Sequence, residues 1–269
     1  MNGELPGREI TEDTALGGRI RVRQFRSGYR FSIDAVLLAH EAARRPGESV
    51  VDLGTGCGII SLIIGYLRPQ RRICGVEYDT GSVRLARENI KSNQMADRIT
   101  ILEGDIRRLR RQDLGPDMTP DLLVSNPPFR PVNAGRINPD TRRAAARHEL
   151  TLTLADLAAA ARRLLNKNGR FLVIYPAWRC AELLAALSNQ DLAPKRLRPV
   201  YSRPEARDAR LLLVEAVRSG RPGLEFLRPL YLHEGRTPDE TGKNGRPDYS
   251  AEVARMLEPA REAESAGLR

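Results

Sequence analysis

The chain has 269 residues, of which 41% are hydrophobic and 29% are charged, enough for one large domain or a domain with an appendage. No apolar stretch approaches the roughly 18 residues that cross a bilayer, and the polar N-terminus does not resemble a signal or transit peptide, so we expect a cytoplasmic protein and no membrane partner. Three scattered cysteines without a CxxC pair or a histidine cluster argue against both a disulfide scaffold and a metal site.

The charge balance favours a polyanionic partner. Lysine and arginine number 44 against 34 acids, for a net charge of +10 and a pI near 10.0. Such a surplus is typical of nucleic-acid-binding proteins, although codon bias in a GC-rich genome is an alternative reason for choosing arginine over lysine. The basic residues cluster in four segments: 68–72, 107–111, 136–147 and 195–210. Dispersed clusters predict patches on a folded surface.

In chain order, a preface comes first. Residues 19–25 alternate basic and apolar side chains and predict a strand of a small hairpin, and residues 33–43 predict a helix. We assign residues 1–48 to this preface, residues 49–234 to the main domain and residues 235–269 to a polar tail. Within the tail we expect a short helix at residues 251–257.

The main domain alternates strands with helices. Strands are predicted at 49–53, 72–77, 99–102, 122–125, 171–175 and 211–217. Helices are predicted at 59–67, 81–93, 153–165 and 181–187. This alternation predicts βαβ units, and therefore an α/β fold with a doubly wound, mostly parallel sheet.

A glycine-rich turn joins the first strand of the main domain to its first helix. Asp52 ends the strand, and Gly54, Gly56 and Gly58 follow in a G-x-G-x-G spacing. A dinucleotide site would show G-x-G-x-x-G, and an acid there would repel a pyrophosphate. The acid suits a cationic amino-acid group instead, which favours S-adenosylmethionine over NAD.

Two further acids end the next two strands. Glu77 follows Gly54 by 23 residues, where a carboxylate could accept both ribose hydroxyls, and Asp105 could accept from an adenine amino group. A solvated strand-end residue is the alternative for each acid taken alone. Together with Asp52 they mark the carboxyl edge of the sheet, where ligands bind in open α/β folds.

Four residues directly after a buried strand indicate the reaction. In Asn126-Pro127-Pro128-Phe129, two prolines remove two backbone donors and keep the chain extended. The amide side chain and the bare carbonyls can accept the hydrogens of a planar amine, while Phe129 stacks on its base. The motif predicts methylation of a nitrogen, and a proline-stiffened loop is the alternative.

Basic residues flank this motif. Arginines in the segment 133–147 could bind phosphates while a base enters the pocket, and a solvated helix face is the alternative. His148 is a candidate base, but no general base is required, and a histidine beside Arg147 suits a structural or phosphate-facing role better.

With these motifs, the chain resembles class I S-adenosylmethionine-dependent N-methyltransferases, most closely the bacterial tRNA-valine adenine-N6 methyltransferase family. The resemblance rests on residues 28–38, 51–60, 124–131, 147–149 and 151–157. It implies a seven-stranded sheet, S-adenosylmethionine as cofactor, tRNA as partner and a lid over the cofactor that includes Tyr29. The residues alone also allow another interpretation of the lid segment, in which apolar side chains lead into the helix at 33–43 and Ser32 is its N-cap.

The resulting site has two parts. The residues assigned to the cofactor are Tyr29, Phe31, Ser32, Asp34, Asp52, Gly54, Thr55, Gly56, Gly58, Glu77, Asp105, Ile106 and Asn126. The residues assigned to catalysis are Asn126, Pro127, Pro128 and Phe129. No metal ligand is assigned.

Three alternatives remain open at this point. Phe129 stands where tyrosine is commoner in the family, and phenylalanine also occurs in guanine-N2 methyltransferases of ribosomal RNA. A protein glutamine-N5 methyltransferase would share the chemistry, although the preface is too short for the usual helical domain. A catalytically silent nucleic-acid-binding module is the third alternative, against which the intact Asn126 and the three acids argue.

Overall fold

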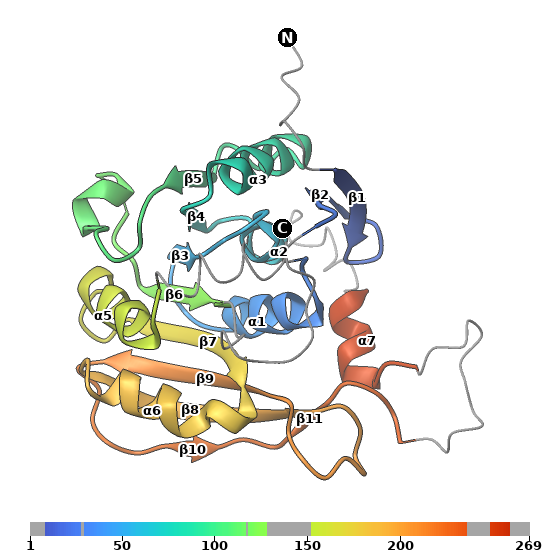
Figure 1. Cartoon of the computed structure of the whole chain (residues 1–269), viewed down its shortest axis with the longest axis vertical. Coiled ribbons are helices and arrows are strands. Elements are labelled where there is room, and N and C mark those ends of the chain that lie inside the picture. Colours follow the sequence, from blue (N-terminus) through green and yellow to red (C-terminus); the bar gives the residue numbers. More distant parts are fainter. Residues whose placement is uncertain (1–8, 28–29, 117, 128–151, 236–247, 259–269) are drawn as a thin grey trace, which may run out of the picture.

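The computed structural model describes residues 9–27, 30–116, 118–127, 152–235 and 248–258. Its main sheet has the strand order β10-β8-β9-β7-β6-β3-β4-β5, with β11 also beside β8 (Figure 1). The strands are β3 (Ser49–Leu53), β4 (Arg72–Glu77), β5 (Ile99–Glu103), β6 (Leu122–Ser125), β7 (Arg170–Pro176), β8 (Leu192–Tyr201), β9 (Leu211–Arg218), β10 (Glu225–Phe226) and β11 (Leu230–Tyr231). The sheet therefore has seven longer strands, β3 to β9, and two strands of two residues each.

The strand directions confirm the doubly wound fold. Strands β5, β4, β3, β6 and β7 are mutually parallel, and β9 runs antiparallel between β7 and β8. The chain moves outward from β3 to β4 and β5 and then returns to place β6 on the other side of β3. This reversal creates a switch point at the carboxyl ends of β3 and β6, the place where open α/β sheets bind ligands.

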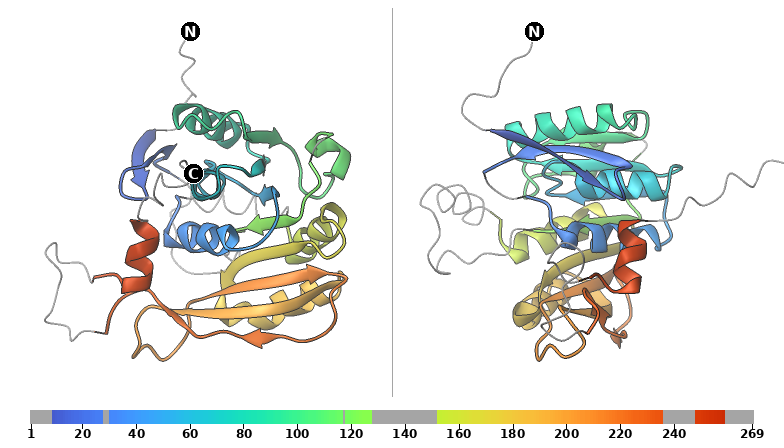
Figure 2. Two further views of the ribbon diagram at one scale, coloured as in Figure 1. Left: turned by 180° about the vertical axis from the view of Figure 1, so that it is seen from behind. Right: turned by 90° about the vertical axis from the view of Figure 1, so that its right-hand side faces the viewer.

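Helices cover both faces of the sheet. They are α1 (Ile33–Ala43), α2 (Ile59–Leu67), α3 (Thr80–Ser92), α5 (Leu154–Leu164), α6 (Cys180–Ser188) and α7 (Ala251–Leu257), with short 3-10 turns η1 (Arg111–Leu114) and η2 (Ala177–Arg179). Figure 2 shows α5 and α6 on one side and α1, α2 and α7 on the other. Successive strand residues point to opposite faces, so Val50 packs in the cluster with α1 and α2, and Val51 in the cluster with α5 and α6.

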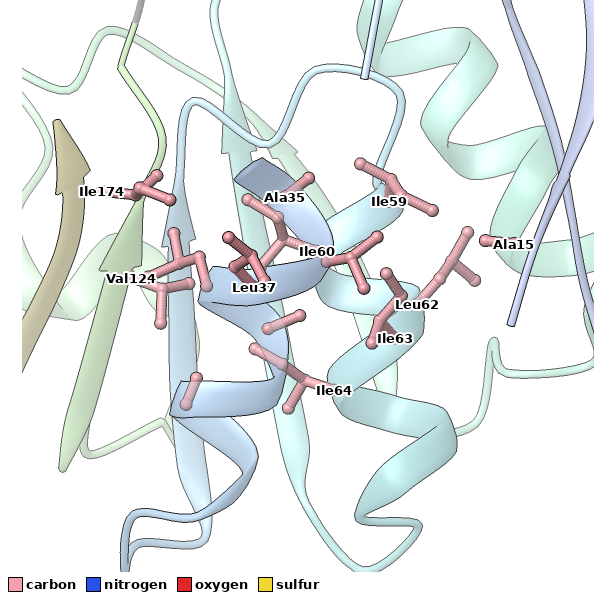
Figure 3. Close-up of a cluster of buried hydrophobic side chains, with 14 of the residues drawn as sticks. Ala15, Ala35, Leu37, Ile59, Ile60, Leu62, Ile63, Ile64, Val124 and Ile174 are labelled. Atoms are coloured by element: carbon pink, nitrogen blue, oxygen red, sulfur yellow. The ribbon is translucent and has the colours of Figure 1, made fainter. Parts of the chain in front are cut away.

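The preface shares its core with the main domain. In α1, every residue from Ala35 to Ala43 is buried, and Figure 3 shows Leu37 of α1 facing Ile60 of α2, with Val124 of β6 beside them. The hairpin of β1 (Ile10–Ala15) and β2 (Ile20–Phe25) is fastened to α3 by Asn89, whose side chain bonds both backbone groups of Arg23 at 2.8 Å.

Most predicted elements are present, and one long strand was missed. The helices at 33–43, 59–67 and 251–257 have the predicted bounds, and Thr153 forms the predicted capping box at the start of α5. Strand β8 was not predicted because Pro194 and Pro199 interrupt a basic segment. Prolines are tolerated in β8 because it lies near the sheet margin, where only the short β10 and β11 pair with its outer side, and because a bulge at Pro194 relaxes the ladder.

Candidate active site

The glycine-rich turn leaves β3 and enters α2 at the switch point. The amides of Gly54 and Thr55 both donate to the Val76 carbonyl of β4, at 2.9 and 3.0 Å. Gly54 and Gly56 have φ angles of +76° and +57°, a region that residues with a Cβ rarely adopt. A Cβ added at either glycine would meet no atom within 4 Å. The turn therefore exposes its backbone to open space at the carboxyl edge.

Asp52 lies beneath this turn and holds it in place. The side chain is fully buried, and its Oδ2 accepts hydrogen bonds from Thr55 Oγ1 at 2.6 Å and Ser61 Oγ at 2.9 Å. Its Oδ1 has no hydrogen-bond partner among the described residues. Burial raises the pKa of Asp52 to about 6, with a smaller contribution from the negative charge of Glu77, while the two hydroxyl donors oppose the rise.

The buried carboxyl predicts a pH effect on stability. Because the folded-state pKa lies above the unfolded value, the native state binds the proton more tightly, and the free energy of unfolding should fall as the pH rises from about 4 to about 6. Asp52→Asn keeps an acceptor oxygen without the charge, and between about pH 4.5 and 7.5 it should remove about 2 kcal/mol of this fall. Urea unfolding of both proteins at about pH 4.5 and 7.5 measures the difference. Equal pH dependence in the two proteins would contradict it.

Glu77 reaches the same turn from the end of β4. Its Oε2 accepts from the Gly56 amide at 3.0 Å, and its Oε1 accepts from the amides of Tyr78 and Asp79 at 2.8 and 2.9 Å. The carboxylate is half-buried and placed beside the open space above the glycines. The structure thus brings together Asp52, the turn and Glu77, as the sequence predicts.

Asp105 follows β5 at the same edge, and its carboxylate accepts hydrogen bonds from Arg107. Arg107 donates to it from Nε at 2.9 and 3.1 Å and from Nη2 at 2.6 Å. These bonds lower the pKa of Asp105. The role of Arg107 was missed, since the sequence placed it in a basic surface cluster. Ile106 packs into the core with α5, while a Cβ at Gly104 would meet no atom within 4 Å.

Asn126 and Pro127 stand beside the turn. Strand β6 pairs with β3, and Ser125 Oγ donates to the Leu53 carbonyl at 2.8 Å, which joins the two strand ends just before the motif. Asn126 is 7% exposed. Pro128, Phe129, His148 and the arginines of the segment 133–147 lie outside the described residues.

The predicted lid is held by the hairpin. The Phe31 amide donates to Gln24 Oε1 at 3.1 Å, and Gln24 Nε2 donates to Asp13 Oδ2 at 2.8 Å. Arg30 pairs with the same Asp13 at 2.9 Å. Gln24 was missed, although a signal was present: it falls on the buried side of β2, in phase with Ile20 and Val22.

Ser32 and Asp34 begin the helix that carries the lid into the core. Ser32 occupies the N-cap position of α1, as predicted, but its hydroxyl makes no capping hydrogen bond. It bonds Asp34 instead, whose pKa is raised by burial and lowered in part by this bond and by the charge of Arg210. Tyr29 lies outside the described residues.

A model of the family described as "Methyltransferase small domain" matches residues 30–190. The chain belongs to this family. A tRNA1(Val) (adenine(37)-N6)-methyltransferase of Porphyromonas gingivalis is 35% identical over 198 residues, covering 72% of this chain and 77% of the relative. A protein of the same name from Aeromonas hydrophila is 34% identical over 190 residues, covering 70% and 77%.

A solved structure supports the fold. A predicted O-methyltransferase from Agrobacterium tumefaciens superposes with a TM-score of 0.62 at 23% identity, covering 83% of this chain and 95% of the other. The family confirms the predicted methyltransferase activity and its cofactor S-adenosylmethionine, and the superposition supports the class I fold.

Two features are absent from the residues that the structure describes. None of their helices combines the length and apolarity of a bilayer-crossing segment. They also contain no cluster of three or more histidine, cysteine or acidic side chains arranged to hold a metal ion.

Proposed function

We propose that this methyltransferase modifies the exocyclic N6 of an adenine in tRNA. The similarity to adenine-N6 methyltransferases of tRNA1(Val), extending over 72% of the chain, carries the proposal. The net charge of +10 supports a polyanionic substrate. We place the protein in the cytoplasm, where tRNA is modified in bacteria.

The described residues fit the cofactor. A Cβ would meet no atom within 4 Å at Gly54 and Gly56 after β3 or at Gly104 after β5, the strands on either side of β4, and the unbonded Asp52 Oδ1 is an acceptor beneath the glycine turn. Glu77 would accept the ribose hydroxyls, and Asp105 and Ile106 would flank the adenine. Phe31, Ser32 and Asp34 would cover the methionine portion together with Tyr29. When bound, S-adenosylmethionine supplies an electrophilic methyl group on a sulfonium.

The acceptor side is built by the motif after β6. An exocyclic amine is a poor nucleophile because its lone pair is delocalised into the ring. The Asn126 side-chain oxygen and the Pro127 carbonyl would accept its two hydrogens, raising the electron density on nitrogen and fixing its direction. Phe129 would stack on the base, and the proton would leave to solvent. Because β6 lies directly beside β3, the motif and the glycine turn share one edge, so catalysis works mainly through positioning.

One observation favours a second substrate. Phe129 in place of tyrosine suits a guanine-N2 methyltransferase of ribosomal RNA as well as an adenine enzyme. The names of the relatives favour adenine.

The substrate class is tested by offering each candidate substrate to the enzyme in turn. The enzyme is incubated with methyl-labelled S-adenosylmethionine and, separately, with unmodified tRNA transcribed in vitro, with ribosomal RNA and with release-factor protein. We expect label in the tRNA, suppressed by excess S-adenosylhomocysteine. If label appears only in ribosomal RNA or only in protein, the proposal that tRNA is the substrate is wrong.

A further inference from the structure

Several of the described arginines in the predicted basic clusters are used within the fold. Arg71 is 3% exposed and donates to the Ala42 carbonyl, so it does not belong to the surface patch predicted at 68–72, whereas Arg72 is exposed. Arg111 donates to the carbonyls at the end of α5. In β8, Arg196 pairs with Glu225 and Arg198 pairs with Glu252. These side chains stabilise the protein and are not available to a ligand.

The loop between β8 and β9 is different. It spans residues 202–210 and contains Arg203, Arg207 and Arg210, none of which forms an ion pair with a carboxylate among the described residues. The two acids of this loop are Glu205 and Asp208, and they likewise form no ion pair among the residues that the structure describes. The loop therefore presents arginine side chains whose donors are not committed to the fold.

This loop lies at the carboxyl edge, beside the candidate active site. Strand β8 runs parallel to β7 and β6, so it ends at the edge where Asn126 lies, and the loop projects at the lower right of Figure 1. The Arg210 amide donates to the Val200 carbonyl at 2.8 Å, which fixes the base of the loop. The charge of Arg210 also acts on Asp34 of the proposed lid.

An exposed tryptophan adjoins the loop. Trp178 follows β7, is 70% exposed and is the only tryptophan in the chain. Its neighbour Ala177 donates a backbone hydrogen bond to the Arg210 carbonyl at 3.0 Å, which joins the two segments. The guanidinium of Arg179 lies over the Trp178 ring, 5.6 Å from its centroid. A large apolar ring held in solvent next to uncommitted arginines is typical of surfaces that bind single-stranded nucleic acid.

We propose that Trp178, Arg203, Arg207 and Arg210 form a docking surface for the tRNA segment next to the target base. Trp178 stacks on a neighbouring unpaired base, and the arginines bind the phosphates that follow it. Strand β7 separates β6 from β9, and adjacent strands are about 4.8 Å apart, so the surface lies within reach of a nucleotide adjoining the one held at Asn126. The inference rests on the proposed function in taking tRNA as the polynucleotide.

The single tryptophan gives a direct readout. Titration of the enzyme with unmodified tRNA should quench tryptophan emission along the same curve as binding measured by filter retention. Trp178→Ala should weaken tRNA binding about tenfold and raise the KM for tRNA, with unchanged kcat and unchanged affinity for S-adenosylmethionine. Phe226→Ala is the matched control, because Phe226 is 72% exposed on β10, away from this edge. This variant should bind tRNA with the affinity of the native protein.

The arginines are tested by salt dependence. The double variant Arg203→Ala/Arg207→Ala should weaken tRNA binding at least tenfold and reduce the slope of log Kobs against log salt by about one per arginine. Arg210 is kept because of its influence on Asp34. Arg221→Ala, an exposed arginine beyond the opposite end of β9, should leave both quantities unchanged.

The outcomes separate this surface from the proposed reaction. Unchanged tryptophan emission at saturating tRNA, or equal losses in the control variants, would overturn the surface even if methyl transfer occurs. Quenching and weakened binding in the variants without any methyl transfer would support the surface and reject the reaction.

Discussion

Replacing Asn126 with alanine should lower kcat for methyl transfer by about 10²- to 10³-fold, the scale seen when one positioned polar group is removed from an active site. The amide oxygen is the acceptor that we assign to the substrate amine, and alanine leaves that hydrogen without a partner. Single-turnover transfer of labelled methyl to tRNA measures the chemical step. Calorimetry should show that S-adenosylmethionine still binds.

The adjacent residue provides the control for Asn126. Ser125→Ala removes the hydrogen bond to the Leu53 carbonyl and should cost about 1 kcal/mol of stability, with far less effect on kcat. A similar loss of kcat in both variants would indicate a general disturbance of the β6 end. Full activity of Asn126→Ala would contradict the acceptor role.

Replacing Glu77 with glutamine should weaken S-adenosylmethionine binding by about 2 kcal/mol, roughly thirtyfold, because the charge-assisted hydrogen bonds that we propose to the ribose would be lost. Glutamine keeps a similar shape, but its NH2 group must face a backbone N–H that donates to Glu77 in the native protein, so part of the loss comes from a loosened glycine turn. Calorimetry gives the affinity directly. The loss should also appear as reduced thermal stabilisation by the ligand.

The neighbouring strand offers a matched control. Glu103 ends β5 directly opposite Glu77 in the register, and it accepts a hydrogen bond from Thr80 at 2.6 Å. Glu103→Gln changes the same charge at the same sheet edge and should leave the affinity for S-adenosylmethionine unchanged. Equal affinity losses in the two variants would point to a general electrostatic effect and refute the specific role of Glu77.

The sequence predicts the cofactor end of the fold well because local chemistry determines it. The G-x-G-x-G spacing requires positive φ angles that the structure shows, and the acids at residues 52 and 77 follow from strands with clear apolar patterns. The helix at 33–43 is equally clear from its apolar residues and is almost entirely buried.

Long-range side-chain pairing could not be predicted in the same way. Whether Arg71 is buried, or whether Arg111 donates to the carbonyls at the end of α5, depends on which segments meet in the folded chain. Strand β8 was missed because its prolines and charges oppose a strand locally, and its position near the sheet margin overrides that preference. Charge clusters in sequence therefore overstate the surface that is open to a nucleic acid.

The identity of the methylated atom tests the account most directly. Unmodified tRNA is incubated with the enzyme and labelled S-adenosylmethionine, digested to nucleosides and separated against standards. We predict N6-methyladenosine as the labelled product, and its loss with Asn126→Ala. Label in N2-methylguanosine, or at a carbon or a ribose oxygen, would contradict the account.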